Sequence, residues 1–143
     1  MSDSKKMAAG AVIARREGGE WLLLVLRAYR NWDFPKGVVE TGEEPFAAAQ
    51  REVTEETGLA DLEFPLGEEH CDTLPYAGGG KIARYYLAET TQENIRLPIS
   101  EELGRPEHHE WRWVNFDEAE DLLPPRLAIV LDWARRVLPS SDP

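Results

Sequence analysis

The chain has 143 residues, of which 42% are hydrophobic and five are tryptophan, so it can bury one substantial core and is not a disordered segment. Its formal net charge is −11, from 27 acidic and 16 basic residues. That charge disfavours nucleic acids and anionic membranes as partners, because their phosphates would be repelled, but it permits a small polyphosphate that arrives with metal.

The domain organisation is expected to be simple. No internal repeat and no long linker divides the sequence, so we interpret residues 1–138 as a single domain and residues 139–143, which are rich in Pro and Ser, as a flexible tail. Cys71 is the one cysteine, which rules out an intrachain disulfide and fits a reducing, cytoplasmic compartment. We interpret Cys71 as a small hydrophobe rather than a nucleophile.

The first elements predicted along the chain are two strands joined by a turn. Met7–Ala14 and Trp21–Leu26 are apolar runs of strand length, and the first of them is too short to span a membrane. Glu17–Glu20 contains two glycines and suits a tight turn. These three segments predict a β-hairpin with a well-buried second strand.

A helix is predicted to follow, beginning at Pro45, whose missing N–H has no partner in the first turn anyway, and ending at Gly58 as a left-handed cap. Before it, Gly37 and Gly42 bracket a short loop that can approach a ligand closely. Apolar residues recur along the helix at a spacing that gives it a core-facing stripe. They are Phe46, Ala49 and Val53.

The middle of the chain is expected to return to strands. Leu62–Leu66 and His70–Leu74 have interrupted strand character, whereas Lys81–Ala88 and Glu110–Asn115 have the aromatic content or the alternation of strands. The glycines at 78–80 are interpreted as a hairpin tip, since they lack the spacing and the hydroxyl residue of a phosphate-binding loop.

The last third of the chain predicts a loop and two helices. Asn94–Leu103 has no regular pattern and is expected to be a loop near the substrate, while Asp117 suits the N-cap of a short helix. The run Arg126–Leu138 carries a helical apolar stripe formed by Leu127, Val130, Leu131, Ala134 and Val137. Together these elements predict an α/β fold, with a mixed β-sheet and helices on both faces.

Carboxylates in the first predicted helix carry the most information about chemistry. Glu52, Glu55 and Glu56 stand at i, i+3 and i+4, so they fall within about 100° of one another on one helix face. Like charges at this spacing repel by roughly 0.2–0.5 kcal/mol per pair, and Mg²⁺ or Mn²⁺ would turn that repulsion into attraction. Arg51 either contacts phosphate directly or, as we favour, forms a two-bond bridge to Glu43.

The stretch Gly37–Leu59 resembles the Nudix box, the loop–helix–loop signature of hydrolases that act on nucleoside diphosphates linked to another moiety. The pattern is Gly, five residues, Glu, seven residues, then Arg-Glu-hydrophobic-any-Glu-Glu-any-Gly-hydrophobic. Every specified position is matched, by Gly37, Glu43, Arg51, Glu52, Val53, Glu55, Glu56, Gly58 and Leu59. Such a match is far more specific than a lone glycine motif; the alternatives are an acidic surface helix and a Nudix fold without catalysis.

The resemblance implies an α/β/α Nudix sandwich that hydrolyses a pyrophosphate bond with Mg²⁺ or Mn²⁺ as cofactor. It implies that Glu52 and Glu56 are metal ligands, that Glu55 is a ligand or the partner of one, and that a backbone carbonyl near Gly37 is a further ligand. In the family the residue equivalent to Arg51 makes the bridge to the loop. A carboxylate beside the metal can accept the proton of the attacking water.

Residues outside the box resemble the diadenosine polyphosphate hydrolases of the same family. Trp32, Lys36 and the box loop match their W-x-x-P-K-G-x-x-E-x-G-E stretch, with Lys36 placed to meet phosphate and Trp32 either lining the base pocket or anchoring the core. Lys81 and Tyr85 are similar to a substrate strand in which a lysine meets phosphate and a tyrosine stacks on adenine; Tyr85 packing in the core is the alternative.

A second stretch outside the box supports the same subfamily. Glu107 and the residues that follow resemble an E-H-x-x-x-x-W strand, where the glutamate is a candidate metal ligand or base. His109 is a candidate proton relay, and a structural zinc would need more Cys or His ligands than the chain offers.

The sequence also departs from that subfamily. Val38 and Thr41 stand where those hydrolases have His and Pro, and residues 94–106 look longer, which leaves the preferred polyphosphate length open.

The expected function is asymmetric hydrolysis of dinucleoside polyphosphates such as diadenosine tetraphosphate. The alternatives are a pyrophosphatase of oxidised or ordinary nucleoside triphosphates, an RNA 5′-end pyrophosphohydrolase, and a non-catalytic nucleotide sensor. We expect a small nucleotide polyphosphate as partner, no nucleic acid, no membrane, and a monomer or homodimer.

Overall fold

The computed structural model describes residues 6–106 and 108–139, and these form a seven-stranded mixed sheet with helices packed on it. In chain order the elements are β1 (Lys6–Glu17), β2 (Glu20–Ala28), β3 (Asn31–Asp33), β4 (Lys36–Val38), α1 (Pro45–Thr57), β5 (His70–Asp72), β6 (Lys81–Glu89), β7 (Glu110–Val114), α2 (Phe116–Leu122), a 3₁₀ turn (Pro125–Leu127) and α3 (Ala128–Val137). The predicted strands and helices are thus present with few exceptions.

Strand β1 is the centre of the sheet. Its C-terminal half forms the predicted hairpin with β2, with Ala14 opposite Leu23, and its N-terminal half pairs with β4 on the same edge, with Ala9 opposite Gly37. The other edge of β1 pairs in parallel with β6, and β5 extends the sheet beyond β6. β2 pairs with the C-terminal half of β1 only, and β4 pairs with the N-terminal half along the same edge. The loop after β4 therefore begins close to the middle of the sheet.

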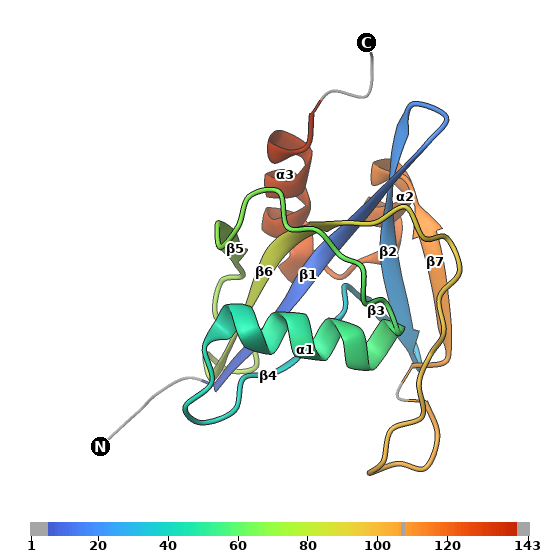
Figure 1. The fold of residues 1–143 in the computed structure, drawn as a ribbon. Coiled ribbons are helices and arrows are strands. Elements are labelled where there is room, and N and C mark those ends of the chain that lie inside the picture. Colours follow the sequence, from blue (N-terminus) through green and yellow to red (C-terminus); the bar gives the residue numbers. More distant parts are fainter. Residues whose placement is uncertain (1–5, 107, 140–143) are drawn as a thin grey trace.

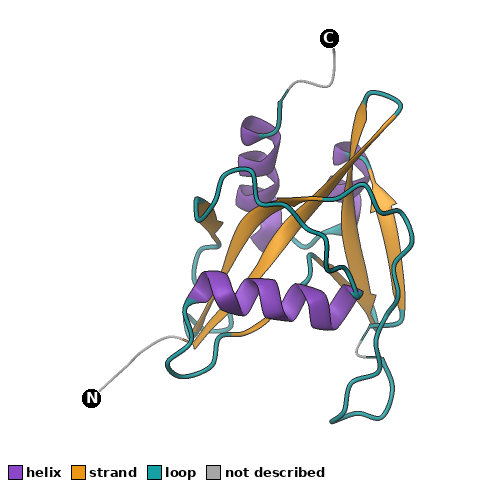
Figure 2. Cartoon of the chain, in the orientation of Figure 1, coloured by secondary structure: helices purple, strands orange, loops and turns teal. Residues whose placement is uncertain are grey.

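Helices cover both faces of the sheet, as the sequence predicts: α1 crosses one face, while α2 and α3 pack on the other (Figures 1 and 2). Side chains of β1 alternate between the two layers. Val12 and Ala14 belong to the apolar cluster that contains α3, whereas Ala11 and Ile13 pack with Val53 of α1. This is the α/β/α arrangement expected from the sequence.

Helix α1 begins and ends where the sequence predicts. Pro45 is its first residue, and Gly58 follows it with a φ of +74° and donates its N–H to the carbonyl of Thr54. The buried side of the helix includes Ala49 and Val53, both fully buried. Local signals suffice here because a proline start, a glycine cap and an apolar stripe all act within a few residues.

One predicted strand is wrong. Leu62–Leu66 forms no strand, although Glu63 makes an isolated antiparallel bridge to Glu89. The chain turns away at this point, since the N–H of Gly67 bonds to the carbonyl of Phe64. Leu62 and Phe64 are apolar because they pack against the core beside α1, not because they belong to the sheet.

The predicted N-cap of α2 is also wrong by two residues. Asn115 caps the helix: its side chain accepts a hydrogen bond from the N–H of Glu118 at 2.8 Å, and the Glu118 carboxylate accepts one from the N–H of Asn115 at 2.9 Å. This reciprocal pair satisfies two backbone donors, which a cap at Asp117 would leave unsatisfied.

The predicted helix Arg126–Leu138 is divided in the structure into the 3₁₀ turn, which contains Leu127, and α3. Its apolar stripe is nevertheless used as expected, since Leu127, Val130, Leu131 and Ala134 are buried. Pro139 follows it, and its carbonyl accepts a hydrogen bond of 2.9 Å from the indole of Trp21. The remainder of the predicted tail lies outside the described residues. Among the described helices none is long and apolar enough to cross a membrane.

Candidate active site

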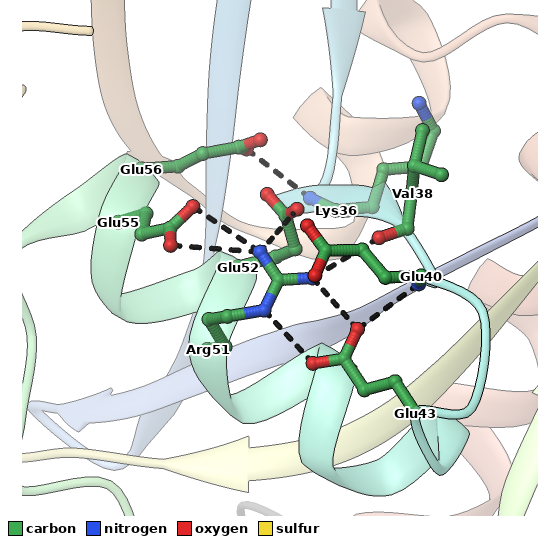
Figure 3. Close-up of polar contacts among 8 residues, drawn as sticks. All are labelled: Lys36, Val38, Glu40, Glu43, Arg51, Glu52, Glu55 and Glu56. Atoms are coloured by element: carbon green, nitrogen blue, oxygen red, sulfur yellow. Dashed lines mark hydrogen bonds and ion pairs between the residues drawn. The ribbon is translucent and has the colours of Figure 1, made fainter. Parts of the chain in front are cut away.

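The carboxylates predicted to bind metal lie on α1, beside β4. The helix is held against the sheet by Ala49 and Val53, and Glu56 is buried with them, so this packing fixes the direction in which the carboxylates point. Glu52, Glu55 and Glu56 gather around the start of the box loop, as Figure 3 shows. The helical spacing read from the sequence is therefore realised as one acidic face.

Arg51 connects the acidic side chains to the loop. Its Nε and Nη2 donate to the two carboxylate oxygens of Glu43 at 2.8 and 2.9 Å, which is the two-bond bridge that we favoured (Figure 3). Its Nη1 donates to Glu52 at 2.9 Å and lies 3.4 Å from Glu55, while Nη2 also donates to the carbonyl of Val38 at 3.1 Å. One guanidinium thus ties β4, the loop and α1 together.

The charges in this bridge are stable over a wide pH range. The Arg51 guanidinium, helped by the N–H of Glu40, lowers the pKa of the Glu43 carboxyl from 4.5 to about 2. In return, the hydrogen bonds that Arg51 donates to Glu43 raise the pKa of Arg51, and Glu52 adds to this effect. The loop is therefore fastened by a fully charged pair at neutral pH.

Glu56 is the buried member of the acidic face, with only 7% of the residue exposed. Its Oε1 accepts a hydrogen bond of 3.2 Å from the backbone N–H of Lys36, which fixes the carboxylate against the beginning of β4 (Figure 3). The ammonium of Lys36 pairs with Asp33, whose Oδ2 lies 3.3 Å from Nζ. Lys36 therefore contributes its backbone to the acidic face and its side chain to Asp33.

Gly37 is the point where the loop backbone comes closest to the acidic face. A Cβ added to Gly37 would overlap the carboxylate of Glu52. Only glycine lets the backbone and this carboxylate occupy such close positions, so the glycine that the motif specifies has a steric cause in this chain.

The donor set suits a hard divalent cation, since Glu52, Glu55, Glu56 and the backbone at Gly37 offer only oxygen ligands. Within the described residues, no three acidic, histidine or cysteine side chains converge as a ready-made metal site. In this arrangement Arg51 engages both Glu52 and Glu55. Glu55, whose side chain is 57% exposed, can exchange its 3.4 Å contact with Arg51 for a cation with little rearrangement.

The acidic face forms one wall of a pocket of about 830 Å³, a size typical of small-molecule sites. The opposite wall is the segment 97–102, with His108 beside it. This segment belongs to the loop that we expected near the substrate, and it extends past the C-terminal end of α1 (Figure 1). Six glutamates and one arginine line the pocket, so a polyphosphate would enter it together with cations.

The structure corrects the prediction that Trp32 and Tyr85 contact a nucleobase. Trp32 is 8% exposed and packs in the α3-side core, with the Arg112 guanidinium 4.8 Å from its ring centroid. Tyr85 is fully buried in the same core, its hydroxyl donates to Asp33 at 2.8 Å, and burial raises its pKa. Both residues are core anchors, because strand alternation turns them away from the α1 face that carries the carboxylates.

The other predicted residues lie elsewhere or beyond the described part of the chain. Lys81 is the exposed first residue of β6, bonds through its backbone to Tyr76, and does not line the pocket. Glu107 lies outside the described residues. The ring of His109 packs edge-on against Tyr29 at 5.0 Å. Cys71 is half-buried and burial raises the pKa of its thiol, which agrees with a packing role.

Asp33 is a residue near the site that the sequence did not reveal. Besides the hydroxyl of Tyr85 and the ammonium of Lys36, it binds Nη2 of Arg126 at 2.8 Å. Arg126 is 93 residues away in the sequence, so no local pattern predicts this contact. The one local signal is the i, i+3 spacing of Asp33 and Lys36, which is too common to carry an assignment.

Comparison with known proteins agrees with this geometry. The NUDIX domain family matches residues 4–134. An asymmetrical bis(5′-nucleosyl)-tetraphosphatase of Caenorhabditis elegans is 33% identical over 117 residues, covering 78% of this chain and 80% of that protein. An RNA pyrophosphohydrolase of Bartonella bacilliformis is 28% identical over 155 aligned positions, covering 92% of this chain and 86% of that protein.

The same likeness is present in three dimensions. The crystal structure of a C. elegans Ap4A hydrolase binary complex matches with a TM-score of 0.78 and 27% identity, over 92% of this chain and 96% of that chain. The family match spans both strands of the hairpin, the box helix and most of α3. The chain therefore belongs to the NUDIX domain family and is a Nudix hydrolase.

Proposed function

We propose that this chain hydrolyses a pyrophosphate bond with Mg²⁺ or Mn²⁺ as cofactor, and that its substrate is a dinucleoside polyphosphate such as diadenosine tetraphosphate, cleaved asymmetrically by water. The observation that carries the proposal is that Glu52, Glu55 and Glu56 line one pocket of 830 Å³ together with Gly37, whose backbone lies against the Glu52 carboxylate. The tetraphosphatase and Ap4A hydrolase of C. elegans that resemble this chain support the substrate class.

The surroundings of each glutamate indicate its role in metal binding or in proton transfer. Glu52, Glu55 and Glu56, with a carbonyl at Gly37, would hold a divalent cation, which withdraws charge from phosphate and lowers the pKa of a bound water. Glu56 is buried and fixed by the Lys36 N–H, so it suits a permanent ligand. Glu55 is the most exposed of the three, so it suits the acceptor of the attacking water's proton.

The cationic residues have different roles in this proposal. Arg51 holds the box loop through Glu43 and positions Glu52, and it does not need to touch phosphate. Lys36 does not line the pocket in this structure, because its ammonium pairs with Asp33, and a phosphate contact requires its flexible side chain to leave that carboxylate. Lys81 also lies outside the pocket and, unlike Lys36, whose backbone bonds to Glu56, it has no contact with the acidic face, so the geometry does not support its assignment to phosphate.

A second candidate function is removal of pyrophosphate from RNA 5′ ends, because the B. bacilliformis relative is an RNA pyrophosphohydrolase. The net charge of −11 and the six glutamates of the pocket weigh against it, since an RNA chain beyond its first nucleotides would be repelled. We therefore rank RNA below a compact dinucleotide.

The test is a hydrolysis screen with Mg²⁺ or Mn²⁺ against dinucleoside polyphosphates, nucleoside triphosphates, triphosphorylated RNA and nucleotide sugars, with identification of the products. Diadenosine tetraphosphate should be preferred and give ATP and AMP, and a chelator should abolish turnover. Glu56→Gln should lose at least about 100-fold in kcat while retaining its fold by circular dichroism. Equal rates on all compounds, or preference for a sugar nucleotide, would remove the dinucleoside assignment, and a nucleotide-binding wild type without turnover would indicate a sensor.

A further inference from the structure

The pocket has an apolar rim that the acidic face does not explain. Val38 of β4 and Ile99 of the 97–102 segment both line it, and they are 63% and 68% exposed. A single exposed aliphatic residue is ordinary, but here two of them, from segments far apart in sequence, border the same pocket.

Both residues are held in place without a ligand. Val38 pairs with Ala8 in the sheet, and its carbonyl accepts a hydrogen bond of 3.1 Å from Arg51. Ile99 forms a bridge with Pro106, and the N–H of Ser100 bonds to the carbonyl of Arg105 at 3.0 Å in the same small hairpin. A ligand that used this rim would therefore lose little free energy in ordering the backbone.

The charged residues that line the pocket near Val38 and Ile99 indicate which part of a nucleotide can bind beside them. Glu101 and Glu102, two and three residues after Ile99, line the pocket, and no lysine or arginine other than Arg51 lines it in the described part of the chain. A phosphate at this end would meet repulsion, whereas an uncharged flat group would not. The face of a nucleobase is poorly hydrated and gains dispersion contacts with aliphatic carbons.

We infer that Val38 and Ile99 form an apolar clamp for a nucleobase of the substrate, while the phosphates lie on the side of Arg51, Glu52 and Glu56. This inference rests on the proposed function and deepens it, since it names the part of the substrate that the rim recognises. The clamp offers carbon atoms and no hydrogen-bonding side chain of its own, so it accepts adenine and guanine alike.

The experiment separates base recognition from phosphate recognition by titration calorimetry in MgCl₂. Two probes are used: a methylene-bridged, non-hydrolysable diadenosine tetraphosphate analogue, and inorganic tripolyphosphate, which has no base. Val38→Ser and Ile99→Ser should each weaken binding of the dinucleotide analogue about fivefold to tenfold, the effect of uncovering about 40–50 Å² of apolar contact. Binding of tripolyphosphate should change less than twofold.

The matched control is Ile129→Ser, which removes the same aliphatic group from α3, where Ile129 is 42% exposed and lies outside the pocket. It should leave both dissociation constants unchanged. Unchanged affinity of the clamp variants for the dinucleotide analogue, or equal weakening of both probes, would overturn the clamp. Hydrolysis by the wild type is measured separately, so a protein that binds through the clamp without cleaving refutes the proposed function and keeps the inference.

Discussion

Arg51 and Glu43 face each other across the box loop, and two hydrogen bonds of 2.8 and 2.9 Å join the guanidinium to the carboxylate (Figure 3). The same guanidinium binds the carbonyl of Val38 and the carboxylate of Glu52. A displacement of the loop would therefore displace Glu52 and the beginning of the clamp at Val38 together. This coupling makes Arg51 a positioning residue whose geometry matters more than its charge.

Replacing Arg51 by lysine tests that statement, because lysine keeps the charge and loses the planar fork. We expect Arg51→Lys to lower kcat at least about tenfold with a smaller change in KM, since the acidic face loses its arrangement rather than its substrate contacts. The control is Arg84→Lys, which alters a similar two-bond pair with Asp72, at 2.9 and 3.1 Å, on β6 and β5. Equal loss of kcat in both variants would show that the effect is general destabilisation.

The lowered pKa of Glu43 predicts a pH dependence of stability. Between about pH 4.5 and about pH 2 the unfolded chain takes up a proton on Glu43 while the folded chain does not, so the contribution of this group is present above pH 4.5 and is lost as pH falls through 2. Urea midpoints of the wild type and Glu43→Gln should differ by a constant amount from pH 7 to pH 5 and converge toward pH 2. A difference that persists at pH 2 would mean that the ion pair is not its cause.

Gly37 of β4 and Gly10 of β1 lie at neighbouring positions of the β1–β4 pair. We expect an added methyl group to lower turnover at Gly37 and to lower stability at Gly10. At Gly37 a Cβ overlaps the end of the flexible Glu52 side chain, so Gly37→Ala should displace that carboxylate, reduce kcat at least about 100-fold and change Tm by only a few degrees. At Gly10 a Cβ overlaps the carbonyl oxygen of Pro35, and backbone cannot yield as easily. Gly10→Ala should therefore cost about 1–3 kcal/mol of unfolding free energy.

The measurements for this pair are thermal unfolding and steady-state kinetics on both variants. Gly10→Ala should lose stability more than turnover at a temperature where it is folded. A Gly37→Ala protein that is strongly unstable, or one that is fully active, contradicts the view that this glycine exists to make room for Glu52.

Asp33 is predicted to matter for stability. Its carboxylate balances the positive charge of Arg126 and accepts a hydrogen bond of 2.8 Å from Nη2. The Nη1 of Arg126 is buried without a hydrogen-bond partner within the described residues. Asp33→Ala leaves that guanidinium against the ring of Tyr76 and should cost about 2–4 kcal/mol of unfolding free energy, measured by urea denaturation. Asp72→Ala, which removes a more exposed partner from Arg84, should cost about 1 kcal/mol or less.

The surroundings of Asp33 show why the positions of Trp32 and Tyr85 could not be predicted from the sequence. Trp32 and Tyr85 are candidates for contact with a base because the sequence around them resembles that of the diadenosine polyphosphate hydrolases, and core packing is the alternative for both. Their strands place both on the α3 side of the sheet, and Asp33 takes up the hydroxyl of Tyr85 there. Which face of a strand is buried under a helix depends on the packing of distant segments, and no short pattern reports it.

Helix α1, by contrast, was predicted with its limits because every signal is local. Pro45 sets its first turn, Gly58 takes the left-handed conformation after its last, and the spacing of Glu52, Glu55 and Glu56 leaves them one possible face. The bridge between Arg51 and Glu43 was also foreseen, since the two residues belong to one motif. The Asn115 cap of α2 was missed because Asn115 and Asp117 are similar candidates, and only the reciprocal bonds with Glu118 distinguish them.

The sequence by itself determined the box helix, its acidic face and the membership of the family, because helix periodicity and capping act over a few residues and bring those carboxylates together in any fold that keeps the helix. Only the tertiary structure decided that Lys36 pairs with Asp33, that Tyr85 is a core residue, and that Val38 and Ile99 border one pocket. Those relations join segments tens of residues apart, and they are set by how the sheet pairs and which of its faces each helix covers.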